Sequence, residues 1–230
     1  MSSHTYRHPR PSVTVDLVIF TVLDTDLKVR LVKRKEPPFQ GWWALPGGAV
    51  RVSDDPGDLG ESVEEAAHRE LEQETGLPKG STFIEQVHTF GAPKRDPRGR
   101  VISVVYVALV RPDLSPLIRA ATDGEDVQWR SMTQPVALAF DHITMIERAL
   151  SKIRDRMDRT AIAFELVPPT FTTAELRQVH EAVTAERYDA GNFRRRFLRM
   201  LTDGVIQKAP GKRQTGSRPA SVYRFVGMPG

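Results

Sequence analysis

The run ESVEEAAHRELEQETGL at positions 61–77 constrains this chain more than any other part of its sequence. It has the composition of a helix over 61–75, and Gly76 follows as a residue suited to the left-handed conformation at a helix end. Glu70 and Glu74 are four residues apart, so their carboxylates project from the same helix face. Carboxylate oxygens bind Mg²⁺, and such an ion would neutralise a diphosphate and orient an attacking water. The run therefore indicates a metal and diphosphate site, although one glutamate pair taken alone is more often a solvated face.

This run resembles the Nudix box, and LPGG at 45–48 resembles the glycine pair that opens it. The positions that match the family pattern are Glu61, Arg69, Glu70, Leu71, Glu74, Gly76 and Leu77. So many matches at fixed spacing favour the family over a chance acidic face. The resemblance implies a mixed sheet between helices, an α/β/α sandwich, and a nucleoside diphosphate-linked ligand. ADP-ribose is the leading candidate for that ligand.

Two departures from the family pattern bear on catalysis. Gln73 stands where the first of two paired glutamates is expected, and a neutral amide cannot supply charge to a metal or act as a base. We therefore expect hydrolysis to be weakened or absent. Twelve residues rather than five separate Gly48 from Glu61, which lengthens the loop that contains DDPGDLG. This insertion either moves the glycines relative to the helix or bulges out without effect.

The resemblance also implies roles for individual residues. The expected ligand-binding residues are Arg34, Trp43, Gly47, Gly48, Glu61 and Arg69. Arginine pairs with phosphate and an aromatic ring stacks on a base, although Trp42 and Trp43 are equally compatible with the core or the surface. Glu70 and Glu74 would bind Mg²⁺ together with the ligand, and they would be the catalytic residues if the domain were an enzyme.

A long amphipathic helix divides the chain. Before it we expect strands at 13–22, 28–34 and 101–110. Apolar side chains then recur at three- and four-residue spacing at Ile143, Ile146, Leu150, Ile153 and Met157. This stripe could pack on its own chain or on a second subunit, and packing within the chain is the preferred interpretation. The helix, about 142–157, would lead from a Nudix-like domain at 1–157 to a second domain at 158–230.

The basic charge of the chain belongs to its second part. Residues 159–230 contain 12 Lys and Arg against 6 Asp and Glu, a net charge of +6, whereas the remainder has 21 against 23, a net charge of −2. A compact basic domain suggests a polyanionic partner, and a solvated basic surface is the alternative.

The second domain follows the order helix, helix, hairpin. Thr172 and Glu175 form a capping-box signature at the start of the first helix, and 192–201 is the second. Short strands at 205–208 and 221–226 would flank a basic loop. This order is typical of a winged helix-turn-helix, in which arginine and asparagine contact base edges and phosphates. The expected DNA-binding residues are Asn192, Arg194, Arg195, Arg196, Arg199, Lys212, Arg213 and Arg218.

Taken together, the two parts resemble the Nudix-related transcriptional regulator family. Beyond the box, the similarity includes FGAPKRDPRGRVISVVYVALV, LAFDH, NFRRRFLRMLTDG and RPASVYRF. The resemblance implies a bacterial homodimer that binds double-stranded DNA at a pseudo-palindromic operator, represses NAD biosynthesis or salvage genes, and responds to ADP-ribose. The sequence does not give the sign of that response.

Two other functions stay open at this point, and several classes are excluded. The chain could be an active ADP-ribose pyrophosphatase with an accessory basic domain, or a ligand-binding module that docks RNA or protein. The sequence contains no cysteine, which excludes disulfides, thiol nucleophiles and cysteine-bound zinc. It has no apolar run of membrane-spanning length and no signal-like start, so a soluble cytoplasmic protein is expected.

Overall fold

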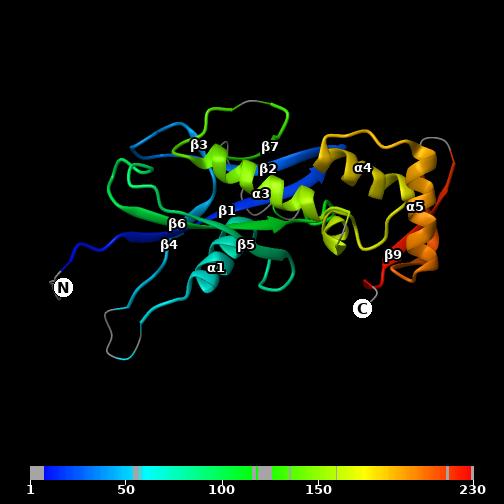
Figure 1. Ribbon diagram of the computed structural model, residues 1–230, viewed down its shortest axis with the longest axis horizontal. Coiled ribbons are helices and arrows are strands. Elements are labelled where there is room, and N and C mark those ends of the chain that lie inside the picture. Colours follow the sequence, from blue (N-terminus) through cyan, green and yellow to red (C-terminus); the bar gives the residue numbers. More distant parts are fainter. Residues whose placement is uncertain are drawn as a thin grey trace.

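The structure is a computed structural model that describes residues 8–53, 57, 59–115, 118, 126–134, 136–158, 160–215 and 218–228. It is elongated, with a large sheet toward one end and a small helical unit with a hairpin at the other (Figure 1). The first part contains the strands β1 (Ser12–Leu23), β2 (Asp26–Lys33), β3 (Trp43–Ala44), β4 (Gly47–Ala49), β5 (Phe83–Phe90), β6 (Val101–Leu109) and β7 (Val127–Ser131), with the helices α1 (Val63–Thr75) and α3 (His142–Arg156). The second part contains the 3-10 helix η1 (Ala161–Leu166), the helices α4 (Thr173–Thr184) and α5 (Ala190–Thr202), and the strands β8 (Ile206–Arg213) and β9 (Ala220–Phe225).

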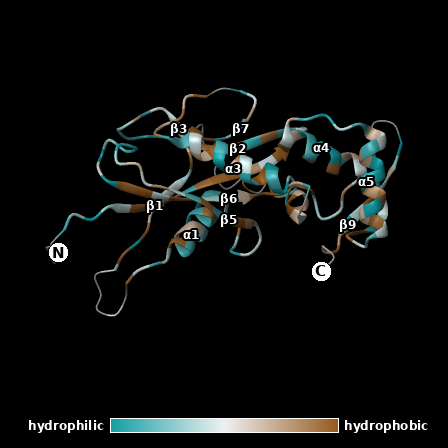
Figure 2. Ribbon diagram, viewed as in Figure 1, coloured by the Kyte–Doolittle hydropathy of each residue, from teal (hydrophilic) through white to brown (hydrophobic). Residues whose placement is uncertain are grey.

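The sheet is mixed and lies between helices. Its strand order is β3-β2-β1-β6-β5, with β4 paired to β1 and β7 paired to β2. The central strands β1 and β6 are parallel, whereas β1 with β2 and β5 with β6 are antiparallel. Alternate residues of β1 enter different layers: Val18 and Phe20 join the core that contains α3, and Leu17 and Ile19 join the core that contains α1. The expected α/β/α sandwich is confirmed, and Figure 2 shows hydrophobic residues along the central strands.

Helix α1 begins and ends where local chemistry dictates. Ser62 caps its first turn and exchanges hydrogen bonds with Glu65, so both halves of a capping box are present. Gly76 ends the helix in the left-handed conformation with φ of 69°. The helix starts at Val63, two residues later than expected, so Glu61 lies just outside it. Of the inserted loop at 54–60, residues 54–56 and 58 lie outside the described residues.

Helix α3 packs on its own chain, as expected. Ile146, Leu150 and Ile153 are buried against the sheet. The prediction was wrong for Ile143, which is 50% exposed. The buried face is centred nearer to Met145, which is fully covered, and this places Ile143 at the solvent edge of the stripe.

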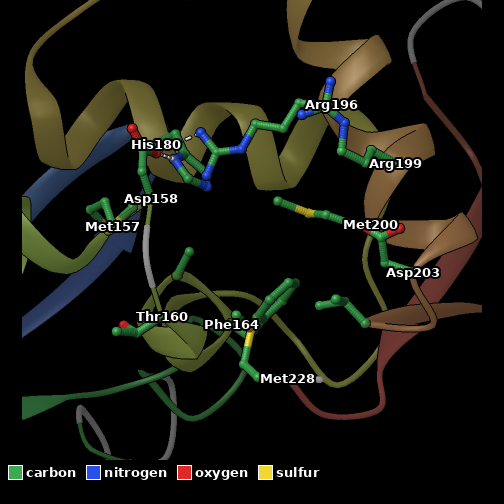
Figure 3. Close-up of a pocket in the computed structure, with 12 residues that line it drawn as sticks. Met157, Asp158, Thr160, Phe164, His180, Arg196, Arg199, Met200, Asp203 and Met228 are labelled. Carbon is green, nitrogen blue, oxygen red and sulfur yellow. Dashed lines mark hydrogen bonds and ion pairs between the residues drawn. The ribbon is translucent and has the colours of Figure 1, made fainter. Parts of the chain in front are cut away.

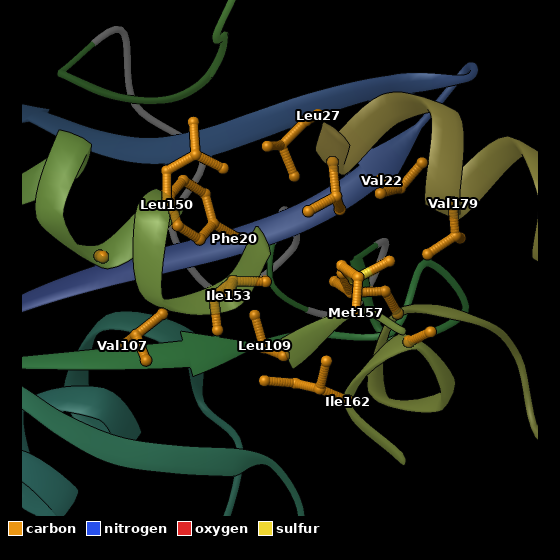
Figure 4. Close-up of a cluster of buried hydrophobic side chains, with 14 of the residues drawn as sticks. Phe20, Val22, Leu27, Val107, Leu109, Leu150, Ile153, Met157, Ile162 and Val179 are labelled. Carbon is orange, nitrogen blue, oxygen red and sulfur yellow. The ribbon is translucent and has the colours of Figure 1, made fainter. Parts of the chain in front are cut away.

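One apolar core continues from the sheet into the second part of the chain. Figure 4 shows Phe20 and Leu109 of the sheet, Ile153 of α3, Ile162 of η1 and Val179 of α4 in the same cluster. A polar contact reinforces this junction, because the Arg154 Nε–H donates to the Val183 carbonyl at 2.7 Å. The end of α3 is therefore attached to α4 by buried contacts and not only through the chain.

The second part has the architecture of a winged helix. Thr172 and Glu175 form the expected capping box of α4, and Phe171 bridges to Tyr223 as a short extra strand beside the hairpin. Strand β8 is longer than predicted: it extends to Arg213, which pairs with Ala220 of β9, so the loop is shorter than 209–220. Among the described residues, no helix is long and apolar enough to cross a membrane.

Candidate ligand pocket and nucleic-acid interface

Glu61, Arg69 and Glu70 form a closed ionic cluster beside the glycine loop. The Arg69 guanidinium donates to both carboxylate oxygens of Glu61, at 2.6 and 2.9 Å, and to Glu70 Oε1 at 2.5 Å. Glu70 in turn lies against the Gly48 backbone, where an added Cβ would be 2.1 Å from Glu70 Oε1. A side chain at position 48 would therefore displace the Glu70 carboxylate from its present place.

The ionisation of this cluster follows from its contacts. Hydrogen bonds from Arg69 lower the pKa of Glu61 to about 2, and the hydrogen bond to Glu61 in turn raises the pKa of Arg69. Burial raises the pKa of Glu74, and the charge of the buried Arg30 opposes that effect. The two carboxylates predicted to bind a metal thus lie in different surroundings, one hydrogen-bonded to Arg69 and one in a desolvated position.

These residues do not form a resident metal cage. Glu70 shares an oxygen with Arg69, and Gln73 is exposed, with its Oε1 3.3 Å from the Arg69 Nη1. Within the described ranges, no group of three or more His, Asp or Glu side chains could hold an ion. Mg²⁺ is usually bound by one or two carboxylates together with waters and substrate phosphates, so Glu70 and Glu74 suit an ion that arrives with a phosphate-bearing ligand better than a resident one.

A polar cavity of about 250 Å³ opens at the edge of the sheet next to this cluster. Its walls come from β1, the residue after β2, β4 and the short segment before it, the loop before β6 and the start of β6, and the start of α3. Its lining is Thr14, Asp16, Arg34, Leu45, Gly47, Gly48, Ala49, Arg95, Asp96, Arg98, Val101, Phe140 and His142. Three guanidinium groups and the glycine backbone in one cavity suit an anionic, phosphate-bearing ligand. We call this cavity the arginine pocket.

Two of its arginines are fixed by paired carboxylates. Arg95 donates to Asp141 through Nε and Nη2, at 3.0 and 2.7 Å. Arg98 binds Asp96 in the same two-pronged way, with its Nη2 2.7 Å from Oδ2. Their planar groups are therefore held in defined orientations before any ligand arrives.

Phe140 organises the remaining wall of the pocket. The Arg34 and Arg98 guanidinium carbons lie 4.8 and 5.3 Å from its ring centre. Phe39 contacts the same ring edge-on at 4.9 Å. The aromatic ring thus links two cations of the pocket to the loop before β3.

His142 connects the pocket to α3. Its Nδ1 accepts the Leu45 N–H at 2.8 Å, so the proton of the neutral ring resides on Nε2, which lies 3.8 Å from Asp16 Oδ1. Burial lowers the pKa of His142, with Asp16 opposing. A neutral histidine at the first residue of α3 therefore connects the helix to the short segment between β3 and β4, just before Gly47 and Gly48.

The arginine pocket includes only part of the predicted ligand set. Arg34, Gly47 and Gly48 line it, and Arg69 lies at its margin, where its Nη2 donates to the Ala49 carbonyl at 3.2 Å. Trp43 is elsewhere: it is half-buried on β3 with the Arg130 guanidinium carbon 4.6 Å from its ring centre. Sequence reasoning missed the lining residues Asp16, Arg95, Asp96, Arg98, Phe140 and His142. The charge-dense run KRDPRGR was the available signal for the three in the loop.

On α5 the predicted DNA-binding residues divide into two groups. Asn192, Arg194, Arg195 and Arg199 are exposed, while Phe193 and Phe197 face the core. Lys212 and Arg218 of the hairpin are exposed as well. Leu198, which sequence reasoning did not single out, is 48% exposed on the outer face of the helix.

Arg196 and Arg213 are already engaged within the protein. The Arg196 Nη1 donates to Asp158 Oδ1 at 2.5 Å across the junction between α3 and α5 (Figure 3). Arg213 donates to Glu175 at 2.6 Å and to the Thr170 carbonyl at 2.9 Å. Arg196, which the sequence predicts to contact DNA, is thus 28% exposed and directed toward Asp158 in this structure.

A cavity of about 260 Å³, the junction cavity, adjoins the Arg196 contact. Its lining is Met157, Asp158, Thr160, Ala163, Phe164, His180, Arg196, Arg199, Met200, Asp203, Val205 and Met228. His180 is almost completely buried, with its Nδ1 3.5 Å from Asp158 Oδ1. Burial, together with the charge of Arg196, lowers the pKa of His180 to about 4.

The fold and these sites define a two-part protein in which a Nudix-type domain carries an anion pocket and a winged helix carries exposed arginines. Comparison with known families agrees: residues 13–149 match the NUDIX domain, and residues 163–225 match the NrtR DNA-binding winged helix domain. A curated relative from Acinetobacter baylyi, the ADPR responsive transcriptional repressor NtrR, is 34% identical over 95% of this chain and 84% of its own length. The chain therefore belongs to the NrtR family of Nudix-related regulators.

Solved structures give the same assignment. Shewanella oneidensis NrtR in complex with a 27mer DNA superposes with a TM-score of 0.78 at 32% identity, covering 93% of each chain. The NUDIX domain of that protein in complex with ADP ribose gives a TM-score of 0.50 at 33% identity, covering 64% of this chain and 90% of that chain. The similarity thus extends over both parts of the molecule.

Proposed function

We propose that this protein is a transcriptional repressor whose Nudix domain senses ADP-ribose and whose winged helix binds double-stranded DNA. The observation that carries the proposal is that one continuous core joins two domains. One domain has an arginine-lined anion pocket, and the other is a winged helix with exposed arginines. Membership of the NrtR family supports it. The regulated genes would be those of NAD biosynthesis or salvage, as the family resemblance suggests, and the protein would act in the cytoplasm.

The proposed ligand contacts centre on the arginine pocket. Arg34, Gly47 and Gly48 keep their expected roles, and Arg95 and Arg98 are added because their guanidinium groups line the same cavity. Glu61 and Arg69 would act at its margin by holding the glycine loop. Trp43 could stack on a base, as expected, only if the Arg130 guanidinium moved away from its ring.

The proposed DNA contacts are the exposed cations and amide of the winged helix. Asn192, Arg194, Arg195 and Arg199 of α5 would enter the major groove, and Lys212 and Arg218 would lie on the backbone beside it. A homodimer would present two α5 helices to a pseudo-palindromic operator, with half-sites roughly 34 Å apart. We propose a domain boundary after Met157, giving 1–157 and 158–230. The two family matches, at 13–149 and 163–225, support this proposal because they lie on either side of it.

Ligand binding would reach the DNA-binding domain through α3. This helix starts at His142 in the arginine pocket and ends at Arg156, just before the junction cavity. A shift of α3 by a few ångströms would change the spacing of two α5 helices in a dimer. Identical dimer geometry with and without ADP-ribose would contradict this route.

We further propose that the Nudix site binds ADP-ribose without efficient hydrolysis. Gln73 stands where the family pattern has a carboxylate, and the Glu70 carboxylate accepts a hydrogen bond from Arg69. The site therefore offers fewer free carboxylates for metal-assisted hydrolysis. Mg²⁺ would enter only with the diphosphate, sharing Glu70 and Glu74 as ligands. Calorimetry of ADP-ribose binding with and without Mg²⁺ measures this contribution.

Gln73→Glu tests the rival function, an ADP-ribose pyrophosphatase. A gain of AMP production in Gln73→Glu, over a nearly inactive native chain, would support the proposal that the native Nudix site has lost hydrolase activity through Gln73. Gln73→Asn is the matched control. Efficient hydrolysis by the native chain, lost in Glu70→Gln, would favour the enzyme instead.

Selection of bound duplexes from genomic fragments tests the main proposal. The selection is run at about 0.15 M salt, which weakens nonspecific phosphate binding, with and without ADP-ribose. Enrichment of one inverted repeat, altered by ADP-ribose, is the expected result. No enriched duplex under either condition would overturn the proposal.

A further inference from the structure

We infer that Asp158 is a positioning residue for DNA binding, which holds Arg196 away from the DNA-facing surface of α5. This inference rests on the proposed function, because it concerns how the winged helix presents its cations to DNA. Asp158 lies two residues after the end of α3, and its Oδ1 accepts from the Arg196 Nη1 at 2.5 Å. The contact joins the linker to the helix that the sequence identifies as the DNA-reading one.

Helical geometry shows what the contact changes. Arg196 lies one residue beyond Arg195 and three residues before Arg199, at the border between the exposed and buried sides of α5. The Arg196 side chain is 28% exposed, whereas Arg195 and Arg199 are more fully exposed to solvent. An arginine at such a border reaches the outer side when its side chain is free, so the partner decides which way it points.

The surroundings of Asp158 favour this paired position without locking it. His180 of α4 is packed beside the pair, with its Nδ1 3.5 Å from the same carboxylate oxygen, and His180 contacts the Phe193 ring at 5.4 Å. The Asp158 side chain is nonetheless 58% exposed, so water screens its attraction for Arg196. A strong polyanion can therefore compete for the guanidinium.

Asp158 also lies at the end of the proposed signalling helix. Movement of α3 shifts Asp158 relative to α5, because the linker residue is attached to the helix end. The same movement would lengthen or shorten the Arg196 contact, which adds or removes one cation per protomer from the DNA-facing surface. The pair thereby connects the ligand pocket to the strength of phosphate binding.

The salt dependence of DNA binding measures how many phosphates the protein neutralises, and so reports whether Arg196 contacts DNA. The probe is the inverted-repeat duplex enriched by the native chain, and affinity is measured from about 0.05 to 0.3 M salt. In Asp158→Asn we expect the slope of log affinity against log salt to steepen by roughly 0.9 per protomer, since one more phosphate is neutralised. Affinity near 0.15 M salt should rise about two- to fivefold per protomer, the scale of an exposed ion pair.

Matched variants separate this effect from a general loss of negative charge. Asp203→Asn removes a carboxylate that lines the same cavity and for which the described residues show no ion pair, so its slope should stay at the native value. Asp158→Glu should keep the native slope because the pair can re-form. Arg196→Ala and the Asp158→Asn, Arg196→Ala double variant should have equal slopes.

The outcomes are decisive in both directions. Equal slopes for Asp158→Asn and Asp203→Asn, weaker binding by Asp158→Asn, or a gain that persists in the double variant would overturn the role of Asp158. Thermal unfolding of each variant should match the native chain, because both aspartates are solvent-accessible. Failure of the native chain to enrich any duplex would instead refute the proposed function. The slopes would then be measured on a duplex of arbitrary sequence, where equal slopes for Asp158→Asn and the native chain would overturn the role of Asp158.

Discussion

The arginines of the ligand pocket and those of α5 differ in what holds them. In the pocket, Arg95 and Arg98 each bind a carboxylate of the protein through two nitrogens. On α5, Arg194 and Arg199 are exposed, with no ion pair within the part of the chain that the structure describes. The pocket therefore fixes Arg95 and Arg98 before a ligand arrives, whereas, among the described residues, α5 leaves Arg194 and Arg199 free for an external partner and pairs only Arg196, with Asp158.

The contrast follows from the size and regularity of the two partners. A small ligand gains affinity when the groups that bind it are already oriented, because little side-chain entropy is then lost. DNA offers a long row of phosphates, so flexible arginines find partners in several conformations and contribute a salt-dependent attraction. Charge alone therefore does not distinguish the two sites. The two-pronged carboxylate pairs of Arg95 and Arg98 do, because Arg194 and Arg199 show no such pair among the described residues.

Arg95→Ala should give the largest effect on stability. The side chain is 5% exposed, and its loss leaves Asp141 unpaired, which should cost about 2–3 kcal/mol of the free energy of unfolding. ADP-ribose affinity should fall roughly tenfold, since a charged hydrogen-bond donor leaves the pocket. Denaturant unfolding and calorimetry measure the two effects. In the matched truncation Arg194→Ala, stability should change by less than about 0.5 kcal/mol, and equal losses in both variants would break the comparison.

His180 should make the winged helix sensitive to mild acid. Its pKa is lowered to about 4 by burial, so the unfolded chain, with a histidine pKa near 6.5, binds the proton more readily. Stability is thus complete above about pH 6.5 and falls as the pH decreases toward 4, by about 2 kcal/mol at pH 5. Glu61, with a pKa of about 2, loses its contribution only below about pH 4.5.

The check is denaturant unfolding of the native chain and His180→Gln at pH 7 and pH 5. The variant should lose about 2 kcal/mol less than the native chain over this interval, although it is less stable at pH 7. His142, whose pKa is also lowered, is present in both proteins and cancels in the difference. An identical pH dependence would show that His180 is not held neutral.

Arg195→Ala should affect DNA binding without affecting the fold. The side chain is exposed on the outer face of α5 and contacts the Asn192 side chain within its own helix. Loss of one phosphate or base contact should weaken operator binding about tenfold and leave the melting temperature and ADP-ribose affinity unchanged. Fluorescence anisotropy with labelled operator measures the change. A fall in ADP-ribose affinity would contradict the separation between the regions.

Local signals in the sequence predicted much of this structure. The spacing of Glu70 and Glu74, the stop at Gly76 and the capping box at Thr172 all act within a few residues, and each element formed where its signal indicated. Periodicity was less reliable at the start of α3, where Ile143 was assigned to the buried stripe but is 50% exposed. A helix stripe gives an average direction, and the packing partner decides its edges.

Contacts between distant segments could not be predicted in the same way. Asp158 with Arg196 and Glu175 with Arg213 are each 38 residues apart, and the arginine pocket combines residues from β1, β4, the loop before β6 and α3. Nothing near Arg196 in the sequence indicates that it faces the linker. Residue type gave the chemistry of these side chains, and the topology determined which of them met.

The shared core at the junction has a consequence for how modular this protein is. Ile153, Met157, Ile162 and Val179 pack together, so cutting the chain after Met157 would expose apolar surface on both halves. Heating should therefore melt the sheet and the winged helix in one transition, and the excised winged helix should aggregate. The two domains that the sequence separates at Met157 are therefore expected to unfold together as one unit in this chain.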